Sequence, residues 1–463
     1  MAHLLRITDG TTTVDLMASP TYFVERYAPG SPEVQAAAVA ASLYGGEVGQ
    51  PRYENVTESA DLFLRAATVA ALQTLVQSIE TMLQKAHRRQ RLRVGERIYL
   101  QVQLDGEAQV WRSEILTGRL VIPEDGLELW PNKALTAQLI VQRRPFWEGA
   151  EVELQLSTST LSAATGGRTI YNHDDSGSGH DNWVQIASSQ VGGLLPAPVR
   201  VELRNTAGAA VNVSAVHLAV DAFGDPAFSH VIEGESRASG GTVTADATSS
   251  GGSYNNLSVP GAAEMAFALA ASLLQNSGGR YWRLLARLAQ TVSGNLYLTP
   301  VLENSAGREV WRGAEVLVTA LVTDLGVKDW GAIPLPPVEL GATAGGLSLV
   351  LSVRYTGSGT GGLLLDFLQL TPAEAVRTLR FGGTAIAAND VLVDDGIEDR
   401  CWCELSGTRQ PGGAVEGAPL MVWPGRTQRL MVLYDEVDGG PVEHVIGRTL
   451  SVRVYYRPRR LTV

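Results

Sequence analysis

The sequence is poor in cysteine: its 463 residues contain two, Cys401 and Cys403. In one strand these positions share a face about 7 Å apart, which is too far for a relaxed disulfide. No second cysteine pair and no neighbouring histidine completes a zinc set. We therefore expect two reduced, half-buried thiols.

Long hydrophobic runs are also missing. The longest, Met265–Leu274, is about half the length that a helix needs to cross a bilayer. The opening residues Met1–Arg6 lack a basic segment followed by an apolar one, so we expect no signal peptide. The sequence predicts a protein that is made in the cytoplasm and does not insert into a membrane.

Charged residues are scarce as well, at 18% of the sequence, and the net charge is −11. A nucleic-acid-binding protein normally carries a basic face, so nucleic acid is not an expected partner. Hydrophobic residues reach 45% and glycines number 49. This composition indicates several cores built from short strands with tight turns, spread over three or four domains.

One long helix is predicted, over 59–91. Ser59 suits an N-cap, and Asp61 would lie in the first turn, where the helix dipole favours an acid. Lys85, Arg88, Arg89 and Arg91 would crowd the last turn, where the dipole favours cations. The predicted apolar stripe follows steps of three and four and consists of Leu62, Ala66, Val69, Leu72, Val76, Ile79, Leu83 and Ala86.

The remaining sequence alternates like strands between glycine and proline turns, so the predicted fold class is mainly β, with several β-sandwiches. We expect four segments: a β domain with the helix (1–155), a linker and sandwich segment (156–230), a jelly roll (231–372) and a C-terminal β domain (373–463). Arg143–Trp147 would be an interface anchor or an aromatic lid over the core. The basic run Arg457–Arg460 would be a solvated end or a docking surface.

Three groups of residues resemble parts of phage tail proteins. The N-terminal segment, closing in Arg143–Gly149, resembles the tail-tube-like ring domain of siphophage distal tail proteins. The turn at Pro424–Arg426 and the closing Tyr455–Arg459 look like C-terminal parts of tail and baseplate components. Between them, Ile232–Glu235, Ser250–Tyr254 and Leu365–Leu370 resemble a galactose-binding-like carbohydrate-binding module.

The resemblance implies a structural virion protein of a phage tail tip, a distal tail or baseplate ring subunit without enzymatic activity. Its partners would be copies of itself in a hexameric ring, the tail tube, the tail hub and host-surface glycans. Heterologous contacts would close the ring, for example the Arg143–Trp147 corner or the basic run against acidic Asp394–Asp399. The alternative function is a glycan-binding adhesin module without a role in a ring.

In the carbohydrate-binding family, the opening glutamates and a terminal aspartate often hold a structural calcium ion. In this sequence these positions are Glu233, Glu235 and Asp366, whose oxygens suit a hard cation. The alternative is that both glutamates point to solvent from an edge strand and the aspartate caps a loop. No other cofactor is expected.

Other motifs favour ordinary structure over chemistry. The ligand-rich stretch His173–Asp181 is interrupted by glycines and indicates a hydrated loop, although imidazole and carboxylate groups could bind a metal. Gly357–Gly362 matches a dinucleotide-binding pattern, but the next segment reads as a strand instead of a helix, which indicates a hairpin.

Adjacent acids such as Asp394 and Asp395 could serve a glycosidase, yet acids on turns are usually solvated. Tyr254, Trp282 and Trp330 could face a sugar or belong to a core.

Overall fold

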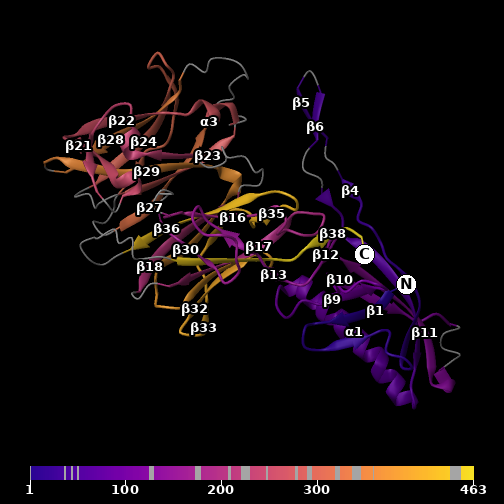
Figure 1. Ribbon diagram of the computed structural model, residues 1–463. Helices are drawn as coiled ribbons and strands as arrows, with labels where there is room; N and C mark the ends of the chain where they lie inside the picture. The colour runs from indigo at the N-terminus through magenta and orange to yellow at the C-terminus, as the bar shows by residue number, and fades with distance from the viewer. Residues whose placement is uncertain are drawn as a thin grey trace. The chain divides into compact units, whose positions relative to one another are not determined.

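The computed structural model describes residues 2–35, 38–42, 45–48, 52–124, 130–172, 179–206, 210–220, 230–246, 249–276, 280–288, 295–318, 324–335, 346–357, 359–437 and 450–462. It confirms a mainly β fold with several sheets (Figure 1). The chain divides into two compact units. Unit 1 comprises Met1–Glu151, Gly192–Leu195 and Arg457–Val463; unit 2 comprises Val152–Val191 and Pro196–Tyr456. No helix in the described ranges is long and apolar enough to cross a membrane. The four predicted segment boundaries stay predictions.

Unit 1 is an antiparallel sheet covered by helix α1 (Val69–Leu92). The strand order is β2-β1-β9-β10-β11-β8-β3, with β2 and β3 at the two ends of the path. Alternate residues of each strand face a core that also receives the apolar side of α1. The strands are β1 (Ala2–Thr8), β2 (Thr13–Asp15), β3 (Tyr22–Ala28), β8 (Val56–Arg65), β9 (Tyr99–Leu104), β10 (Trp111–Val121) and β11 (Ala134–Arg143).

The predicted start of the helix is wrong. Residues from Ser59 to Arg65 belong to β8, which pairs with β11 on one side and β3 on the other. The N-cap is Thr68, whose hydroxyl accepts a hydrogen bond from the Ala71 amide at 3.1 Å. Asp61 therefore accepts a hydrogen bond from Gln138 within the sheet and does not stabilise a helix end. The predicted basic last turn is confirmed.

Residues 457–462 return to unit 1. β38 (Arg459–Arg460) pairs with β12 (Trp147–Glu148), and β12 pairs with β10. Unit 1 is therefore completed by residues that lie more than 300 positions after its sheet.

A two-stranded arm leaves unit 1 between β3 and β8 (Figure 1). Its base pairs β4 (Val34–Gln35) with β7 (Arg52–Tyr53), and its outer part pairs β5 (Ala38–Ser42) with β6 (Gly45–Val48). Among the described strands, these two pairs join no larger sheet.

The described strands of unit 2 form three sheets. One has the path β13-β37-β17-β31-β32-β33, and another has the path β22-β28-β24-β25. The longest runs β20-β21-β29-β23-β27-β36-β18-β30-β34 and faces both others. The main strands are β17 (Ala197–Asn205), β18 (Val211–Val220), β21 (Ser253–Val259), β22 (Ala262–Ala268), β23 (Tyr281–Leu288), β24 (Leu296–Glu303), β27 (Asp324–Pro334), β28 (Ser348–Tyr355), β29 (Gly361–Pro372), β30 (Val376–Ile386), β31 (Val391–Asp395), β32 (Arg400–Leu405), β36 (Gln428–Val437) and β37 (Leu450–Tyr456). Shorter ones are β13 (Val152–Glu153), β20 (Thr242–Ala245), β25 (Glu309–Arg312), β33 (Thr408–Pro411) and β34 (Val415–Glu416).

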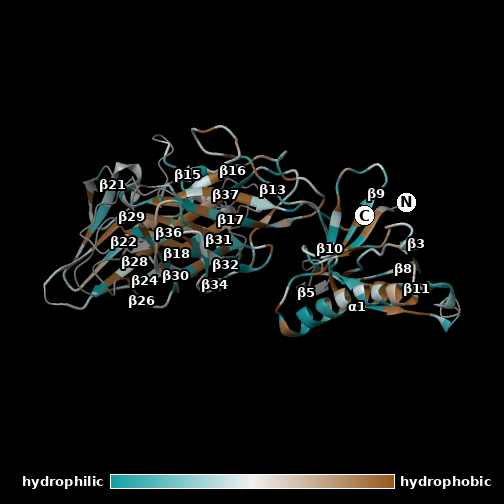
Figure 2. Cartoon of the chain, turned by 90° about the horizontal axis from the view of Figure 1, so that it is seen from below, coloured by the Kyte–Doolittle hydropathy of each residue, from teal (hydrophilic) through white to brown (hydrophobic). Residues whose placement is uncertain are grey.

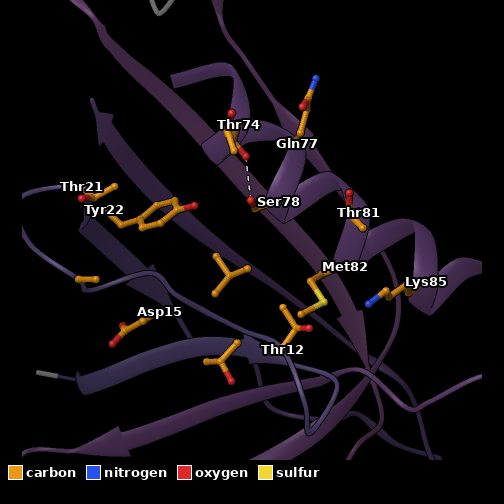
Figure 3. A pocket seen from close by; sticks show the side chains of 13 residues that line it. Thr12, Asp15, Thr21, Tyr22, Thr74, Gln77, Ser78, Thr81, Met82 and Lys85 are labelled. Atoms are coloured by element: carbon orange, nitrogen blue, oxygen red, sulfur yellow. Dashed lines mark hydrogen bonds between the residues drawn. The ribbon is translucent and has the colours of Figure 1, made fainter. Parts of the chain in front are cut away.

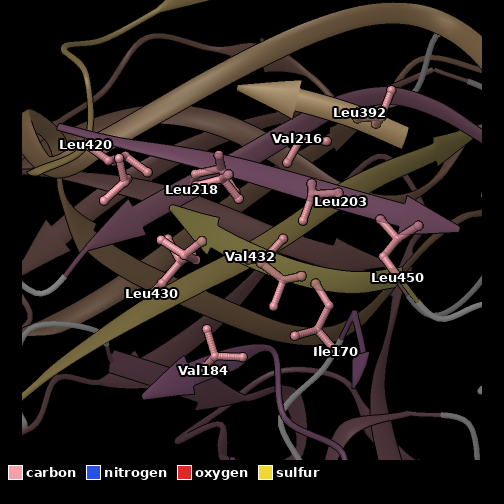
Figure 4. Close-up of a cluster of buried hydrophobic side chains, with 14 of the residues drawn as sticks. Ile170, Val184, Leu203, Val216, Leu218, Leu392, Leu420, Leu430, Val432 and Leu450 are labelled. Carbon is pink, nitrogen blue, oxygen red and sulfur yellow. The ribbon is translucent and has the colours of Figure 1, made fainter. Parts of the chain in front are cut away.

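The long sheet takes part in two sandwiches. One core is formed mainly by leucines and valines of β17, β18, β36 and β37, with Leu203, Val216 and Leu430 among them, and Val184 of β16 (Trp183–Ile186) also belongs to it (Figure 4). The other core lies between β22, β24 and β28 on one side and β21, β23, β27 and β29 on the other. β27 and β36 are hydrogen-bonded neighbours, so the segment 231–372 shares a continuous sheet with later residues.

Candidate functional site

The three carboxylates predicted to bind calcium lie around one short turn of unit 2. Glu233 ends β19 (His230–Glu233), Glu235 lies in the 3-10 turn Gly234–Ser236, and Asp366 lies in β29. The Ser250 amide donates to Asp366 Oδ1 at 2.8 Å, and the Ser250 hydroxyl donates to Glu233 Oε1 at 3.0 Å. The structure thus brings all three side chains to the turn Ser250–Gly252.

Two glycines permit this close approach. A Cβ on Gly251 would lie 2.5 Å from Glu235 Oε1, and a Cβ on Gly234 would lie 2.2 Å from the Leu365 carbonyl oxygen. Gly251 also has φ of +61°, which side chains rarely adopt. Any other residue at either position would push the carboxylates or β29 away.

Burial shapes the electrostatics of this cluster. Asp366 is fully buried, and burial raises its pKa to about 6 although the guanidinium of Arg287 beside it acts in the opposite direction. Burial also raises the pKa of the Glu235 carboxyl, whose Oε2 is buried and has no hydrogen-bond partner among the described residues. A cation near Glu235 would lower the cost of this buried charge.

The donor set fits a hard cation in part. Carboxylate oxygens are the ligands that calcium prefers, and Glu233 and Glu235 supply them. Asp366, however, accepts hydrogen bonds at both side-chain oxygens, from Ser250 and from Arg287. In the described ranges no group of three or more His, Cys, Asp or Glu side chains is close enough to hold one metal ion.

Sequence reasoning missed Arg287. It lies in the apolar strand β23, is 6% exposed and forms an ion pair with Asp366. A single arginine inside a run of leucines is itself a signal, because a buried guanidinium needs a carboxylate partner.

The aromatic residues considered for sugar binding are part of cores. Tyr254, Trp282 and Trp330 are 6%, 2% and 4% exposed, so none of them offers a free ring face. Tyr281, at the start of β23, is 60% exposed.

The loop with many potential metal ligands lies mostly outside the described residues, which omit 173–178. Of its described members, the His180 ring lies 4.3 Å from the Tyr171 ring. Asp181 is buried and accepts hydrogen bonds from the Ser159 amide and hydroxyl, at 3.0 and 2.6 Å. Asp181 therefore holds the local chain together.

Among the described residues, the glycine-rich motif and the two cysteines do not form a binding or catalytic site. Gly361 begins β29 in the glycine-rich pattern, so the segment after the glycines is a strand, as predicted. The predicted hairpin is wrong, because β28 and β29 pair with other strands in two different sheets. Cys401 and Cys403 are free thiols, and burial raises the pKa of Cys403 to about 11. A thiol with this pKa is a poor nucleophile at neutral pH.

The surfaces predicted to join copies are engaged within the chain. Arg143 and Trp147 are fully buried, and Arg143 donates to Glu58 at 2.7 Å, so this corner is a lid over the core. Asp394 and Asp395 lie in β31 and are buried, and Asp394 accepts from Arg377 at 2.9 Å, so the expectation of solvated acids on a turn is wrong for this pair. Arg143, Trp147 and Asp394 are therefore not available at an interface, whereas Asp399 remains exposed, with a side chain that is 70% accessible. A contact between copies at Asp399 stays a prediction.

The basic run is likewise occupied within unit 1. Arg459 donates to Glu148 at 3.0 Å, and Arg460 donates to Glu107 at 3.0 Å. The Arg460 guanidinium also lies 3.8 Å from the Trp111 ring centroid. These contacts attach residues 457–462 to the sheet of unit 1.

Unit 1 also has a pocket of about 620 Å³ between α1 and the β2–β3 segment (Figure 3). Hydroxyl groups of Thr74, Ser78 and Thr81 line it on the helix side, and Thr12, Thr21 and Tyr22 line it opposite. Its lining is mixed and holds no cluster of acids or histidines.

The fold defines a class: a two-unit, mainly β protein whose second unit contains two sandwiches on one long sheet. Comparison with protein-family models gives no match, and no curated protein matches. Among solved structures, the chain is similar to the SPP1 Dit (gp 19.1) protein, a hub adsorption protein of phages that infect Gram-positive bacteria, with 7% identity, a TM-score of 0.34, and coverage of 98% of this chain and 99% of that one.

It is also similar to a component of the phage P2 baseplate in its activated conformation, with 9% identity, a TM-score of 0.31 and coverage of 99% of each chain. One part is similar to TmCBM61 in complex with β-1,4-galactotriose, with 14% identity, a TM-score of 0.18, and coverage of 33% of this chain and 86% of that one. These low scores by themselves establish neither a shared family nor a shared function.

Proposed function

We propose that this protein is a non-catalytic structural subunit of a phage tail tip, a distal tail or baseplate ring protein that assembles as a hexamer. The proposal rests on the sequence resemblance given above and on one structural observation. That observation is the two-stranded arm of unit 1, which pairs with no larger sheet among the described strands.

The arm supports assembly for a physical reason. An isolated two-stranded hairpin is marginally stable in water. Strands β2 and β3 also end the sheet of unit 1, so each has an edge that another strand can join. An arm on one subunit and an open edge on the next form a heterologous pair, which is what a closed ring requires.

Shortening the arm tests this proposal. Gln35 and Arg52 are paired across its base, so replacing residues 36–51 by Asn-Gly closes a two-residue hairpin. We expect wild-type protein to form rings in negative-stain images and in sedimentation, and the shortened protein to stay monomeric with an unchanged unfolding midpoint. Rings from the shortened protein would contradict the role of the arm; a monomeric wild type at all concentrations would contradict the ring itself.

The second candidate, a glycan-binding role of unit 2, is favoured by the exposed ring of Tyr281. Exposed aromatic faces stack on sugar rings. We expect a saturable signal on a glycan array that Tyr281→Ala abolishes and that Tyr254→Phe, a change in the buried core, leaves intact. No signal from wild-type protein would contradict this role.

We further propose that Glu233 and Glu235 hold a calcium ion, which would neutralise two partly buried carboxylates and tie the end of β19 to the turn Ser250–Gly252. Full-length protein is the proper sample because 231–372 shares its sheet with β36. We expect calcium to raise the unfolding midpoint relative to chelator, and Glu235→Gln to remove the difference. Equal midpoints with calcium and with chelator would show that no calcium binds.

A further inference from the structure

The C-terminal end of α1 and the residues after it form a basic surface, here called the arginine tip: Arg88, Arg91, Leu92, Arg93 and Val94. All five side chains are exposed, and Leu92 and Val94 are 51% and 56% exposed. Figure 2 shows hydrophilic residues gathered towards one end of α1, in agreement with this sequence. The tip therefore combines three cations with two aliphatic side chains.

The neighbouring arginines, in contrast, form ion pairs within unit 1. Arg89 and Arg97 form ion pairs with the buried carboxylate of Glu114, at 3.7 and 3.4 Å, and Arg144 joins them at 2.7 Å. Arg88, Arg91 and Arg93 have no ion pair among the described residues. Favourable interaction with the helix dipole accounts for one or two cations at this end, but not for the adjacent exposed leucine and valine.

The backbone at Arg93 adds an independent observation. Arg93 ends α1 with φ of 58° and ψ of 22°, the left-handed conformation that glycine usually occupies at this position. A side chain here costs backbone strain, so a large exposed cation at such a position indicates a role outside the fold.

The distribution of charge between the two units indicates which partner the arginine tip would bind. Unit 1 has equal numbers of Lys/Arg and Asp/Glu residues, so the whole net charge of −11 lies in unit 2. A cationic surface with aliphatic contacts fits an acidic partner, and a second copy of this chain is a partner whose unit 2 carries the net negative charge.

We propose that the arginine tip is an interaction surface for the acidic unit 2 of a second copy of this chain. The inference rests on the proposed assembly and adds to it a contact distinct from the arm. It requires self-association to weaken with salt, because exposed charges are screened beyond about 10 Å at 0.1 M ionic strength.

The test is sedimentation velocity of the full chain at low and high salt. We expect Arg88→Glu with Arg91→Glu to weaken self-association by about a hundredfold at low salt and to remove most of its salt dependence. The matched control is Arg65→Glu with Arg119→Glu, which changes the net charge equally at two exposed arginines elsewhere in unit 1; it should assemble nearly like wild type.

Arg93→Gly separates binding from folding. Glycine relieves the left-handed backbone, so we expect an equal or higher unfolding midpoint together with weaker self-association. Assembly of the double variant at wild-type concentrations would overturn the inference while leaving the proposed ring intact. Tip-dependent binding to heparin without any effect on self-association would also overturn it, since the partner would then be an anionic polymer. A monomeric wild type would overturn both proposals.

Discussion

Buried arginines organise the polar interior of this protein. Arg143 with Glu58, Arg287 with Asp366 and Arg377 with Asp394 each place a guanidinium and a carboxylate away from water. Removing one partner of such a pair leaves an uncompensated buried charge, which is far more costly than the net contribution of the pair.

His217 carries a pH dependence of stability. It is 1% exposed, its Nδ1 lies 3.1 Å from the Thr378 hydroxyl, and burial lowers its pKa to about 4. Asp329 and Glu416 raise this pKa, whereas Arg283 and Arg380 lower it. Between pH 6.5 and 4 the unfolded chain takes up a proton that the folded chain refuses, so stability is lost as the pH falls through this window.

We expect this loss to be about 3 kcal/mol for His217. Asp366 and Asp394 have pKa values raised to about 6, so their contributions have the opposite sign and are lost as the pH rises. Both remain in the variant His217→Gln, which therefore isolates the histidine. Chemical unfolding at pH 6.5 and pH 4 should show that acidification lowers the free energy of unfolding of the variant less, or raises it more, than that of the wild type; equal changes would contradict the assignment.

Single residues were the hardest features to predict from sequence. Glu233, Glu235 and Asp366 were placed together through a family resemblance, and the structure brings them to one turn. Arg287 was not singled out, because its partner lies 79 residues away and periodicity carries no information on such pairing.

At the scale of elements, α1 illustrates how one side of a helix is fixed. Leu83 is 3% exposed, and a Cβ on Gly118 in β10 would lie 2.8 Å from its Cδ2. The glycine thus lets the helix approach the sheet closely.

We expect Leu83→Ala to destabilise the protein by about 2–5 kcal/mol, because it removes buried methyl groups and leaves a cavity. Leu92→Ala is the matched control on the same helix, at a side chain that is 51% exposed, and should change stability by less than about 0.5 kcal/mol. Urea unfolding measures both, and similar values for the two would contradict this packing.

The helix was predictable in type but not in its start. Val56–Arg65 alternates between buried and exposed positions, which is the period of a strand. Leu62 and Ala66 also fit the helical spacing by coincidence, and no glycine or proline separates β8 from α1. Pairing of β8 on both edges decided the outcome, and sequence spacing does not contain that information.

At the scale of the whole molecule, the mainly β class followed from turns and alternation, whereas the shared sheet of unit 2 did not. β36 joins strands from both sandwiches, β18 on one edge and β27 on the other. Such pairing depends on contacts across more than 100 residues, and local patterns do not report it.

Removing residues 457–463 should weaken unit 1. The truncated chain loses the ion pairs of Arg459 with Glu148 and of Arg460 with Glu107, and we expect a loss of about 2–4 kcal/mol. Tryptophan fluorescence during thermal unfolding measures it, because Trp111 lies under Arg460. Removal of Thr462 and Val463 alone is the control, and equal midpoints for the two truncations would contradict the contribution of β38.

The return of the chain to unit 1 also sets an order of events during synthesis. A ribosome delivers residues 1–151 long before residues 457–462, so the emerging polypeptide holds Glu107 and Glu148 without their arginines while unit 2 is being translated. Completion of the sheet made first therefore waits for residues that are translated more than 300 positions later, and a nascent chain that stalls between them leaves β12 without β38.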